Sequence, residues 1–367
     1  MRLSIPQDLL DHGLRTVGRA VSTRGTIPLL SGICLEAAGG RLRLRATDLE
    51  RAVTIDLPAD VAEPGSLVLP GRYLQELVRR MEPGTVSLSP AGPATAIRLA
   101  GGEAEWTVHG FPAEQFPREP EPGSAPAVTV AARALRRLLR ETGFATAHDE
   151  SRPWFTGLFL ALEGERLLAM ATDQAVVAYG EVEAANPAGL AFSLILPGPT
   201  AQELGRLLQN DAAGCCAIHP VQNQLCFRLE EVSLTSRLLE GPYPDFRRLM
   251  PTDYSSRFRL GRTRLLEALD RAALLAHDGE LRLEGEAGAL LLRARTPEVG
   301  SFAERVAAEL SGPPFEVGLN VRYLLEGLRA MEGPDLLLEF AGRRSPVRFR
   351  SGPEAAGFFA VMPLITF

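Results

Sequence analysis

The apolar and polar positions of this chain follow one order three times. Each copy begins with a helical pattern, in which apolar residues recur three and four positions apart, and continues with an apolar strand and a glycine turn. The helical patterns cover residues 7–21, 133–147 and 262–276, and the strands that follow lie at 29–37, at 157–163 and within 280–296. The first two copies then write the same Ala-Thr-Asp, ending at Asp48 and Asp173. A shared order at one spacing predicts three copies of one domain.

Each copy also contains a second half. A short apolar strand, a break and an amphipathic helix recur at 66–81, 193–208 and 316–331. Two stretches rich in proline, 116–126 and 241–251, separate the copies. We therefore expect three domains, each built from two similar halves, with bounds at 1–122, 127–249 and 252–367.

Composition is that of a globular chain, with 46% hydrophobic and 23% charged residues. The first residues lack the apolar segment of a signal peptide, and no apolar run is long enough to span a membrane, so we expect a cytoplasmic, nucleoid-associated protein. The four cysteines do not have zinc-ligand spacing, and we expect small buried residues and no metal or cofactor at these positions: Cys34, Cys215, Cys216 and Cys226.

Charge is unevenly distributed along the chain. The formal net charge is −6, and all 39 basic residues are arginine. The six helical patterns nevertheless sum to a net positive charge, so the strands and loops carry the acidic excess. Arginine is a good helix former, which explains part of this difference. The other explanation is a set of helices that faces a polyanion.

Several motifs resemble those of the bacterial DNA sliding clamps, the beta subunits of DNA polymerase III. Seven of them occur in order over the whole chain: VSTRGTIPLLSGICLEA (21–37), LRATDLE (44–50), LVLPGRYLQEL (67–77), MATD (170–173), YPDFRRLMP (243–251), VGLNVRYLLEGL (317–328) and FFAVMPL (358–364). The resemblance implies an α+β fold of three clamp domains, each with two helices and two antiparallel sheets. It implies that two subunits close into a six-domain ring around duplex DNA, with helices toward the hole.

The function implied by this resemblance is topological tethering, without catalysis. A ring threaded on DNA slides, and tight phosphate contacts would slow it. The DNA-facing residues implied or favoured by their place on helices and in the loop 148–154 are Arg24, Arg72, Arg79, Arg80, Arg133, Arg136, Arg137, Arg140, Arg152 and Trp154. For each single arginine, a solvated helix face is an equally good interpretation.

The family also docks short peptides of polymerases, the clamp loader and repair proteins in an apolar pocket. Mapped onto this chain, the pocket consists of Phe155, Thr172, Val177, Pro244, Arg248, Leu249, Asn320, Tyr323, Pro346, Ala360, Met362, Pro363 and Leu364. Many members have Gly-His-Arg-Leu after the second Ala-Thr-Asp, whereas this chain has Gln-Ala-Val-Val at 174–177. Its MPLITF ending also lacks the usual arginine. These departures predict a more apolar pocket with an altered peptide preference.

The subunit interface of the family joins the first domain to the third domain of the partner. The matching positions here are the apolar Trp106, Leu274 and Leu275 and the acidic Glu298 and Glu304. We expect apolar burial to dominate this homodimer contact.

Three alternatives come from other classes of protein. An enzyme would use Asp48 with Asp173, or the Cys215, Cys216 and His219 cluster, although the two aspartates occupy equivalent places in separate copies and are better explained as buried turn caps. A clamp paralogue would serve repair or a mobile element. A protein scaffold would bind partners without encircling DNA.

Overall fold

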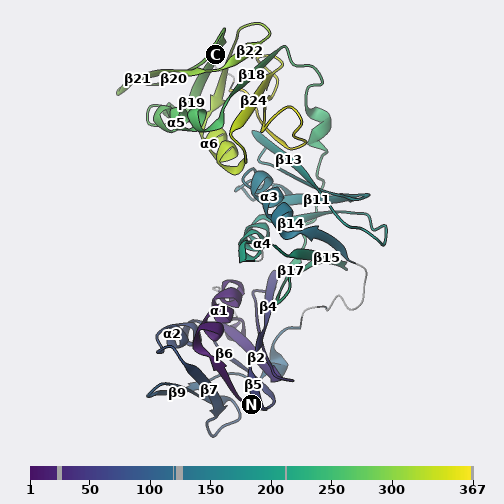
Figure 1. Cartoon of the computed structure of the whole chain (residues 1–367), viewed down its shortest axis with the longest axis vertical. Coiled ribbons are helices and arrows are strands. Elements are labelled where there is room, and N and C mark those ends of the chain that lie inside the picture. Colours follow the sequence, from purple (N-terminus) through teal and green to yellow (C-terminus); the bar gives the residue numbers. More distant parts are fainter. Residues whose placement is uncertain (23–26, 119, 121–126, 211–212, 365–367) are drawn as a thin grey trace. The chain divides into compact units, whose positions relative to one another are not determined.

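The computed structural model describes residues 1–22, 27–118, 120, 127–210 and 213–364. Each repeat contributes two of the α-helices seen in these residues, as the periodicity predicts (Figure 1). They are α1 (Gln7–Val17), α2 (Gly71–Arg79), α3 (Ala132–Gly143), α4 (Gly198–Asn210), α5 (Arg262–Ala272) and α6 (Val321–Ala330). None of the described helices combines the length and apolar character required to cross a membrane.

The strands alternate with these helices in the expected order. In the first repeat they are β1 (Arg2–Pro6), β2 (Gly32–Ala38), β3 (Arg41–Thr47), β4 (Arg51–Pro58), β5 (Asp60–Glu63), β6 (Gly65–Pro70), β7 (Thr85–Pro90), β8 (Ala96–Gly101) and β9 (Ala104–His109). In the second they are β10 (Val128–Ala131), β11 (Gly157–Glu163), β12 (Arg166–Thr172), β13 (Val176–Glu183), β14 (Phe192–Pro197), β15 (Cys215–Val221), β16 (Gln224–Arg228) and β17 (Val232–Arg237). In the third they are β18 (Ser256–Gly261), β19 (Glu280–Glu286), β20 (Ala289–Thr296), β21 (Gly300–Ala307), β22 (Glu309–Ser311), β23 (Phe315–Asn320), β24 (Asp335–Phe340), β25 (Val347–Arg350) and β26 (Phe358–Val361).

Contacts divide the chain into two compact units, and the division runs through the second repeat. One unit comprises 1–132 with 207–238, and the other comprises 133–206 with 239–367. The first unit holds a five-stranded sheet, β5-β1-β7-β8-β9, and an eight-stranded sheet, β10-β15-β16-β17-β4-β3-β2-β6. The second holds a nine-stranded sheet, β14-β11-β12-β13-β26-β25-β24-β18-β22, and a four-stranded sheet, β21-β20-β19-β23. The domain bounds expected from the repeats stay a prediction.

Two of these sheets run from one repeat into the next. In the first unit, β17 of the second repeat pairs antiparallel with β4 of the first. In the second unit, β26 of the third repeat pairs antiparallel with β13 of the second. Consecutive repeats are therefore joined by main-chain hydrogen bonds as well as by their connectors.

The shared Ala-Thr-Asp forms the same turn in both copies. The Asp48 carboxylate accepts hydrogen bonds from the backbone N–H groups of Glu50 and Arg51, and the Thr47 hydroxyl donates to the Arg51 carbonyl. The second copy repeats this pattern, since Asp173 accepts from the N–H groups of Ala175 and Val176 while Thr172 donates to the Val176 carbonyl. Both aspartates cap a turn, as expected, but they are half-buried rather than buried.

The residue after each aspartate has a left-handed backbone. Leu49 has φ of 75° and Gln174 has φ of 80°. This region is costly for residues other than glycine and tolerated best by asparagine and aspartate. The turn thus imposes local strain at the same place in both repeats.

Two expectations about local structure were wrong. Residues 29–31 belong to a 3₁₀ turn, Pro28–Ser31, and the strand begins only at Gly32, because proline at the first position favours helical turns over strand pairing. Cys215 is exposed at the start of β15, whereas Cys34, Cys216 and Cys226 are buried as expected. The alternation of β15 places Cys215 and Cys216 on opposite faces, so one of the two cannot face the core.

Apolar side chains of helices and strands form the cores. In the first unit α1 packs on β3 and β4, and Leu10, Leu14, Leu44 and Leu57 are fully buried there. A Cβ built on Gly13 would lie 2.5 Å from Leu57 Cδ1, so glycine permits this close approach of helix and sheet.

Candidate functional site

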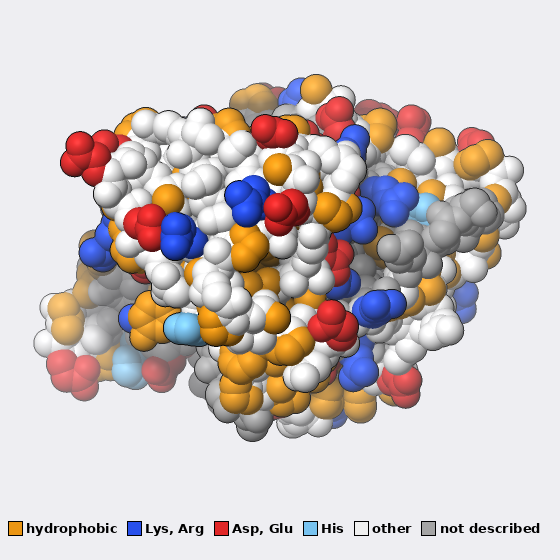
Figure 2. All heavy atoms as spheres, turned by 90° about the horizontal axis from the view of Figure 1, so that it is seen from below, with side chains coloured by type: hydrophobic (Ala, Val, Ile, Leu, Met, Phe, Trp, Pro, Cys, Tyr) orange, Lys and Arg blue, Asp and Glu red, His pale blue; other side chains and the backbone are white. Residues whose placement is uncertain are grey.

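Basic side chains on α2 are exposed but partly neutralised. Arg72, Arg79 and Arg80 all lie on the surface of the first unit. Arg79 and Arg80 share the carboxylate of Glu76, at 2.7 and 3.1 Å. On the face seen in Figure 2, basic and acidic side chains are likewise interspersed. Arg24, another expected DNA contact, lies outside the described residues.

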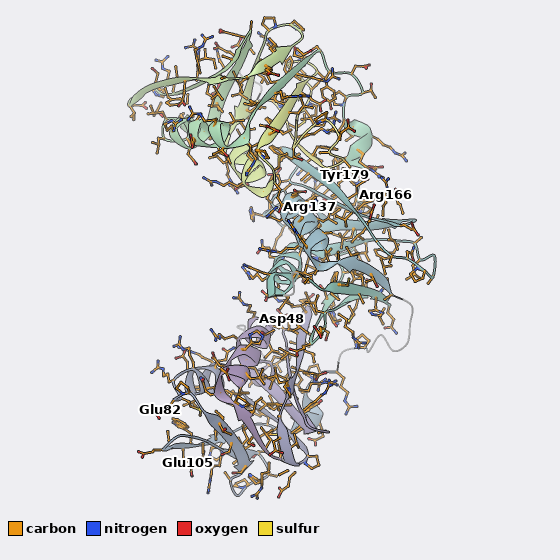
Figure 3. All side chains as sticks on the ribbon, in the orientation of Figure 1. Asp48, Glu82, Glu105, Arg137, Arg166 and Tyr179 are labelled. Carbon is orange, nitrogen blue, oxygen red and sulfur yellow. The ribbon has the colours of Figure 1, made fainter. Side chains whose placement is uncertain are left out.

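The arginines of α3 differ in what they contact. Arg133 and Arg137 are exposed and Arg136 is half-buried, and Figure 3 labels Arg137 on this helix. Arg140 contacts the third repeat: its Nε donates to the Ala330 carbonyl at 2.9 Å, and its Nη2 lies 2.6 Å from Glu332. Arg140 therefore links two repeats, a role that the sequence did not indicate.

The loop before β11 holds Arg152 and Trp154. Arg152 is exposed and donates to the Gln174 side-chain oxygen at 2.6 Å. Trp154 is half-buried, makes an edge contact with Phe155, and packs so close to Gly241 that a Cβ there would lie 2.7 Å from the indole ring. Part of the indole surface is thus already covered by the protein.

The deeper part of the expected peptide pocket is a continuous buried layer. Val177 of β13 pairs directly with Ala360 of β26, and the side chains of Phe155, Thr172, Val177 and Ala360 are at most 7% exposed. Phe155 packs edge-on against Tyr243, with ring centroids 5.5 Å apart. The connector carrying Tyr243 therefore lies next to this layer.

The outer part of the pocket is exposed and largely apolar. Leu249 is 64% exposed, Met362 40% and Leu364 37%. A single exposed leucine is ordinary, whereas a patch of such side chains is typical of a binding surface. Pro244 and Arg248 are also exposed, and Pro363 is half-buried. The backbone N–H of Met362 donates to the Ala175 carbonyl, and that of Leu364 to the Gly318 carbonyl. These hydrogen bonds fix the chain end beside β13 and β23.

The rim residues come from the third repeat. The Asn320 side chain caps α6 by accepting from the Arg322 N–H, and Pro346 is half-buried. Tyr323 is half-buried, and burial together with a hydrogen bond to Asp173 raises its pKa to about 12. Asp173 therefore serves both its own turn and a contact between repeats.

The positions that depart from the family pattern are not equivalent in exposure. Gln174 is exposed, Ala175 is half-buried and Val176 is buried at 1% exposure, opposite Val361. The side chain of Val176 therefore packs in the core, and only Gln174 and Ala175 offer surface to a peptide. Residues 365–367 of the altered ending lie outside the described residues.

The expected interface residues fall in both units, and two of them lie on edge strands, Trp106 on β9 and Glu304 on β21. Trp106 is half-buried on β9, the edge strand of the five-stranded sheet. Leu274 is 83% exposed just after α5, and Leu275 is half-buried, its carbonyl accepting from Thr296 at 3.0 Å. Glu298 is exposed, whereas Glu304 already pairs with Arg271 at 2.6 Å.

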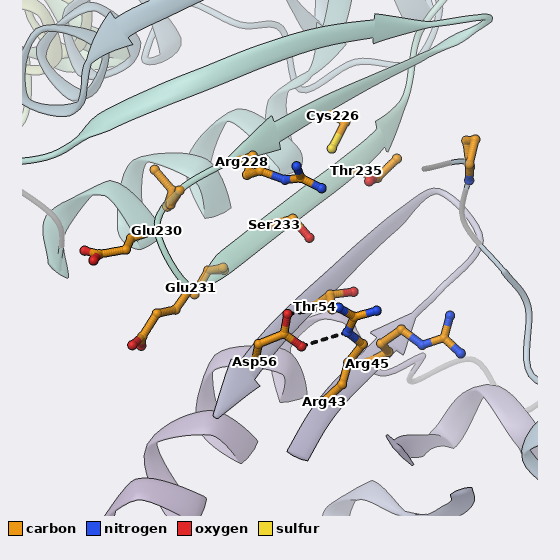
Figure 4. A pocket seen from close by; sticks show the side chains of 13 residues that line it. Arg43, Arg45, Thr54, Asp56, Cys226, Arg228, Glu230, Glu231, Ser233 and Thr235 are labelled. Carbon is orange, nitrogen blue, oxygen red and sulfur yellow. Dashed lines mark hydrogen bonds and ion pairs between the residues drawn. The ribbon is translucent and has the colours of Figure 1, made fainter. Parts of the chain in front are cut away.

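A cavity of about 370 Å³ opens on the eight-stranded sheet where the first repeat meets the second (Figure 4). Arg43, Arg45 and Arg228 project toward it, and Arg43 pairs with Asp56 at 2.7 Å. Arg45 pairs with Glu36 at the same distance. Two of its three guanidinium groups thus have acidic partners, and no motif in the sequence predicts this cavity.

The residues considered for an enzyme have structural roles or are separated. Asp48 and Asp173 each cap their own turn and belong to different units. His219 is buried, while Cys215, four residues earlier on the same strand, is exposed. Among the described residues, no group of three or more His, Cys, Asp or Glu side chains is arranged to hold a metal ion.

Comparisons with known proteins agree along the whole chain. Family models of the DNA polymerase III beta subunit match its N-terminal domain at 1–120, its central domain at 129–245 and its C-terminal domain at 247–364. The beta sliding clamp of Synechococcus elongatus is 33% identical over 99% of each chain, and that of Caulobacter vibrioides is 31% identical over 99% of this chain and 100% of that one.

Solved structures give the same result. The DNA polymerase sliding clamp from Bacillus subtilis has a TM-score of 0.95 and 27% identity over 100% of both chains. A DnaN sliding clamp from Pseudomonas aeruginosa, bound to griselimycin, has a TM-score of 0.94 and 28% identity over 100% of both chains. The chain therefore belongs to the DNA polymerase III beta subunit family, the beta sliding clamps.

Proposed function

We propose that this protein is the DNA-encircling clamp of a replicative polymerase and that it works through three surfaces. Membership of the family assigns the general function, a sliding clamp that gives DNA synthesis its processivity. The three surfaces are an edge-strand contact that closes a homodimeric ring, arginine-bearing helices that face duplex DNA, and an apolar pocket for partner peptides. No step of this function requires a catalytic group or a cofactor, and nothing separately supports a paralogue role.

The observation that carries this proposal is the repeated junction between domains. In two cases, the strand that follows the Ala-Thr-Asp turn of one repeat pairs with the last strand of the next repeat: β4 pairs with β17, and β13 pairs with β26. The third repeat has the corresponding strand, β21, and the first has the corresponding last strand, β9. Both are edge strands of their sheets. An exposed edge is a template for another strand, so a second copy of the chain is its natural partner.

The two internal junctions also predict a register for this third contact. Val53, Ala178 and Phe302 are equivalent, since each pairs with an alanine near the end of the preceding strand, namely Ala46, Ala171 and Ala294. Leu234 and Trp106 are equivalent, since the residues five positions later, Leu239 and Phe111, form matching bridges to Ile195 and Val68. Leu234 faces Val53, and Phe359 faces Ala178. Phe302 is therefore expected opposite Trp106 of the partner subunit.

Apolar contacts support the same interface. Phe302 and Trp106 are both half-buried within one chain, and Val299 is 73% exposed in the turn between β20 and β21. The Thr296–Leu275 hydrogen bond ties this hairpin to the exposed Leu274. Pairing with a partner would bury these groups together, which is typical of stable homodimers.

Disulfide cross-linking tests the register. Directly opposed residues of antiparallel strands have Cα atoms about 4.5 to 5.5 Å apart, which a disulfide accepts. In a Cys215→Ser background, the double variant Trp106→Cys with Phe302→Cys should form a covalent dimer upon mild oxidation. The matched control, Trp106→Cys with Ala303→Cys, places the second thiol on the other face of β21 and should remain uncross-linked. Equal cross-linking of both variants would contradict the register.

The helices suit weak contact with DNA. Arg72, Arg133 and Arg137 are exposed on α2 and α3, whereas Arg79 and Arg80 share Glu76 and Arg140 contacts Glu332. Partial neutralisation lowers the number of counterions released on binding and thus weakens the hold on any one phosphate. A sliding ring needs an electrostatic attraction of this moderate kind.

The peptide pocket would select apolar side chains. Leu249, Met362 and Leu364 form its exposed part, and Ala175 replaces the histidine that many members carry. Apolar side pockets supply affinity, while a few polar groups orient the peptide backbone. Ala175→His should therefore shift the binding preference from apolar-rich toward more polar clamp-binding peptides. An unchanged ranking of peptide affinities would refute the altered preference.

A further inference from the structure

An arginine-rich face lies on the nine-stranded sheet of the second unit, on the side of β25 that continues through Ala360 of β26 toward the peptide pocket. On β18, Arg257 lies opposite Glu339 of β24, and Arg259 lies opposite Leu337 of the same strand. On β25, Arg348 lies opposite Glu339 and Arg350 opposite Leu337. The period of a strand places these four arginines, from β18 and β25, on the same face of the sheet as Glu339 of the intervening β24.

This face forms a cavity of about 590 Å³. Its lining includes the four arginines together with Tyr254, Ser311 and Thr252. At its base, the Glu339 side chain is only 3% exposed and lies 2.7 Å from Arg348, 3.4 Å from Arg257 and 4.0 Å from Arg350. Glu339 therefore holds three guanidinium groups in place beneath the cavity.

Positive charge exceeds negative charge in this lining. Four arginines face two carboxylates, Glu339 and Glu309. Within the described residues Arg259 makes no hydrogen bond or ion pair, although Glu309 is its neighbour across β22. The surplus of two charges is the charge of a phosphate monoester dianion at neutral pH, about −1.5 to −2.

A buried hydroxyl at this cavity lacks a partner. Tyr254 is 8% exposed, and its Oη makes no hydrogen bond with the part of the chain that the structure describes. The Arg348 guanidinium stacks over its ring, 4.3 Å from the centroid. Burial raises the pKa of Tyr254, so the hydroxyl keeps its proton as a donor. Buried donors are rarely left unpaired, and an unpaired one indicates a missing water, ion or ligand.

We propose that this cavity, the Tyr254 pocket, binds a phosphate group, with Arg259 and Arg257 as charged donors and the Tyr254 hydroxyl as a neutral one. Guanidinium forks match the oxygen geometry of phosphate and bind it by two parallel hydrogen bonds. None of the residues that line this pocket is among those assigned to DNA, partner peptides or the second subunit, although Arg348 lies opposite Ala360 of the peptide pocket.

Calorimetric titration of the full-length protein with inorganic phosphate at low ionic strength tests the proposal, with acetate as the carboxylate probe. We expect saturable phosphate binding and much weaker acetate binding. Arg259→Gln should weaken phosphate binding about tenfold, the loss of one charge-assisted hydrogen bond. Tyr254→Phe should weaken it severalfold without lowering the unfolding temperature, because the hydroxyl it removes has no partner.

The matched control is Arg305→Gln, on the four-stranded sheet, where Arg305 pairs with Glu286. This variant should bind phosphate like the unaltered protein, and Arg259→Gln should load onto DNA like the unaltered protein. Absence of saturable binding, or an equal loss in Arg305→Gln, would overturn the site. Acetate binding as tight as phosphate binding would overturn the assignment of phosphate.

Discussion

Arg140 of the second repeat lies 2.6 Å from Glu332 of the third and also donates to the carbonyl of Ala330. Next to this pair, Glu141 is half-buried and lines one pocket together with Met331 and Glu332. The hydrogen bond from Arg140 holds the pKa of Glu332 below its usual value, whereas burial raises the pKa of Glu141. Ionisation of two neighbouring carboxyl groups at one junction therefore has opposite effects on stability: it is favoured by folding at Glu332 and disfavoured at Glu141.

These shifts predict opposite effects of two substitutions. A carboxyl whose pKa is lowered in the folded protein stabilises the fold at pH values above its usual pKa of 4.5, and this stabilisation is lost as pH falls through the folded pKa. Glu332→Gln should therefore destabilise the protein at pH 7 by about 0.5 kcal/mol, the scale of an exposed ion pair. A raised pKa costs stability at neutral pH, so Glu141→Gln should stabilise. The Glu141 difference should vanish as pH falls below the usual pKa of 4.5, whereas the Glu332 difference should persist to lower pH, until pH falls below the lowered folded pKa. Thermal unfolding across pH measures this, and effects of the same sign at pH 7 would refute it.

The conserved geometry of the two turns gives a second prediction. Asp48 and Asp173 each accept two backbone N–H groups, so Asp48→Ala and Asp173→Ala should each lower the free energy of unfolding by about 1 to 2 kcal/mol. Asparagine retains an acceptor and should cost less. Denaturant unfolding measures the loss, and Asp60→Ala, at an exposed position of β5, is the control. An enzyme site at these aspartates would instead predict little change in stability.

The positive φ angles give a third prediction. Replacing Leu49 or Gln174 by glycine removes the strain of a left-handed backbone, which is worth about 1 kcal/mol. Leu49→Gly should therefore stabilise the protein. Gln174→Gly should gain less, because it also loses the hydrogen bond to Arg152. Loss of stability in both variants, measured by thermal unfolding, would show that side-chain contacts outweigh the strain.

Much of this architecture follows from the sequence, because helices and strands have distinct apolar periods. The α-helices of the described residues were predictable from the spacing of leucines such as Leu10 and Leu14. Alternation identifies a strand but carries no information about its partner, so the pairing of β4 with β17 could not be predicted from the pattern. For the same reason the Arg140–Glu332 contact was missed, since it joins residues 192 positions apart.

The candidate sites divide in the same way. The motifs located the pocket residues, but they did not reveal that Val176 is buried while Ala175 is half-exposed, because that depends on the face of β13 that packs inward. The Tyr254 pocket has no motif at all. Its four arginines come from β18 and β25, which lie apart in the sequence and meet only through β24.

The proposed interface gives a fourth prediction. Leu274→Ala together with Leu275→Ala removes apolar groups that only a partner would cover fully, so the protein should shift from dimer toward monomer at micromolar concentration. Sedimentation velocity measures the shift. Leu249→Ala, at another exposed leucine, is the matched control and should remain dimeric. A pair of variants with identical sedimentation would count against the interface.

The central claim is topological binding of DNA, and the most direct measurement is retention on circular DNA before and after it is cut. The protein is loaded onto singly nicked circular duplex by the clamp loader of the same organism, and the circle is then linearised. We predict that the clamp stays on circles at high salt and leaves within minutes once the DNA has ends. The disulfide-linked dimer of the Trp106→Cys, Phe302→Cys variant should not load at all, because its ring cannot open. Salt-sensitive release from intact circles, at the rate seen with linear DNA, would contradict the account.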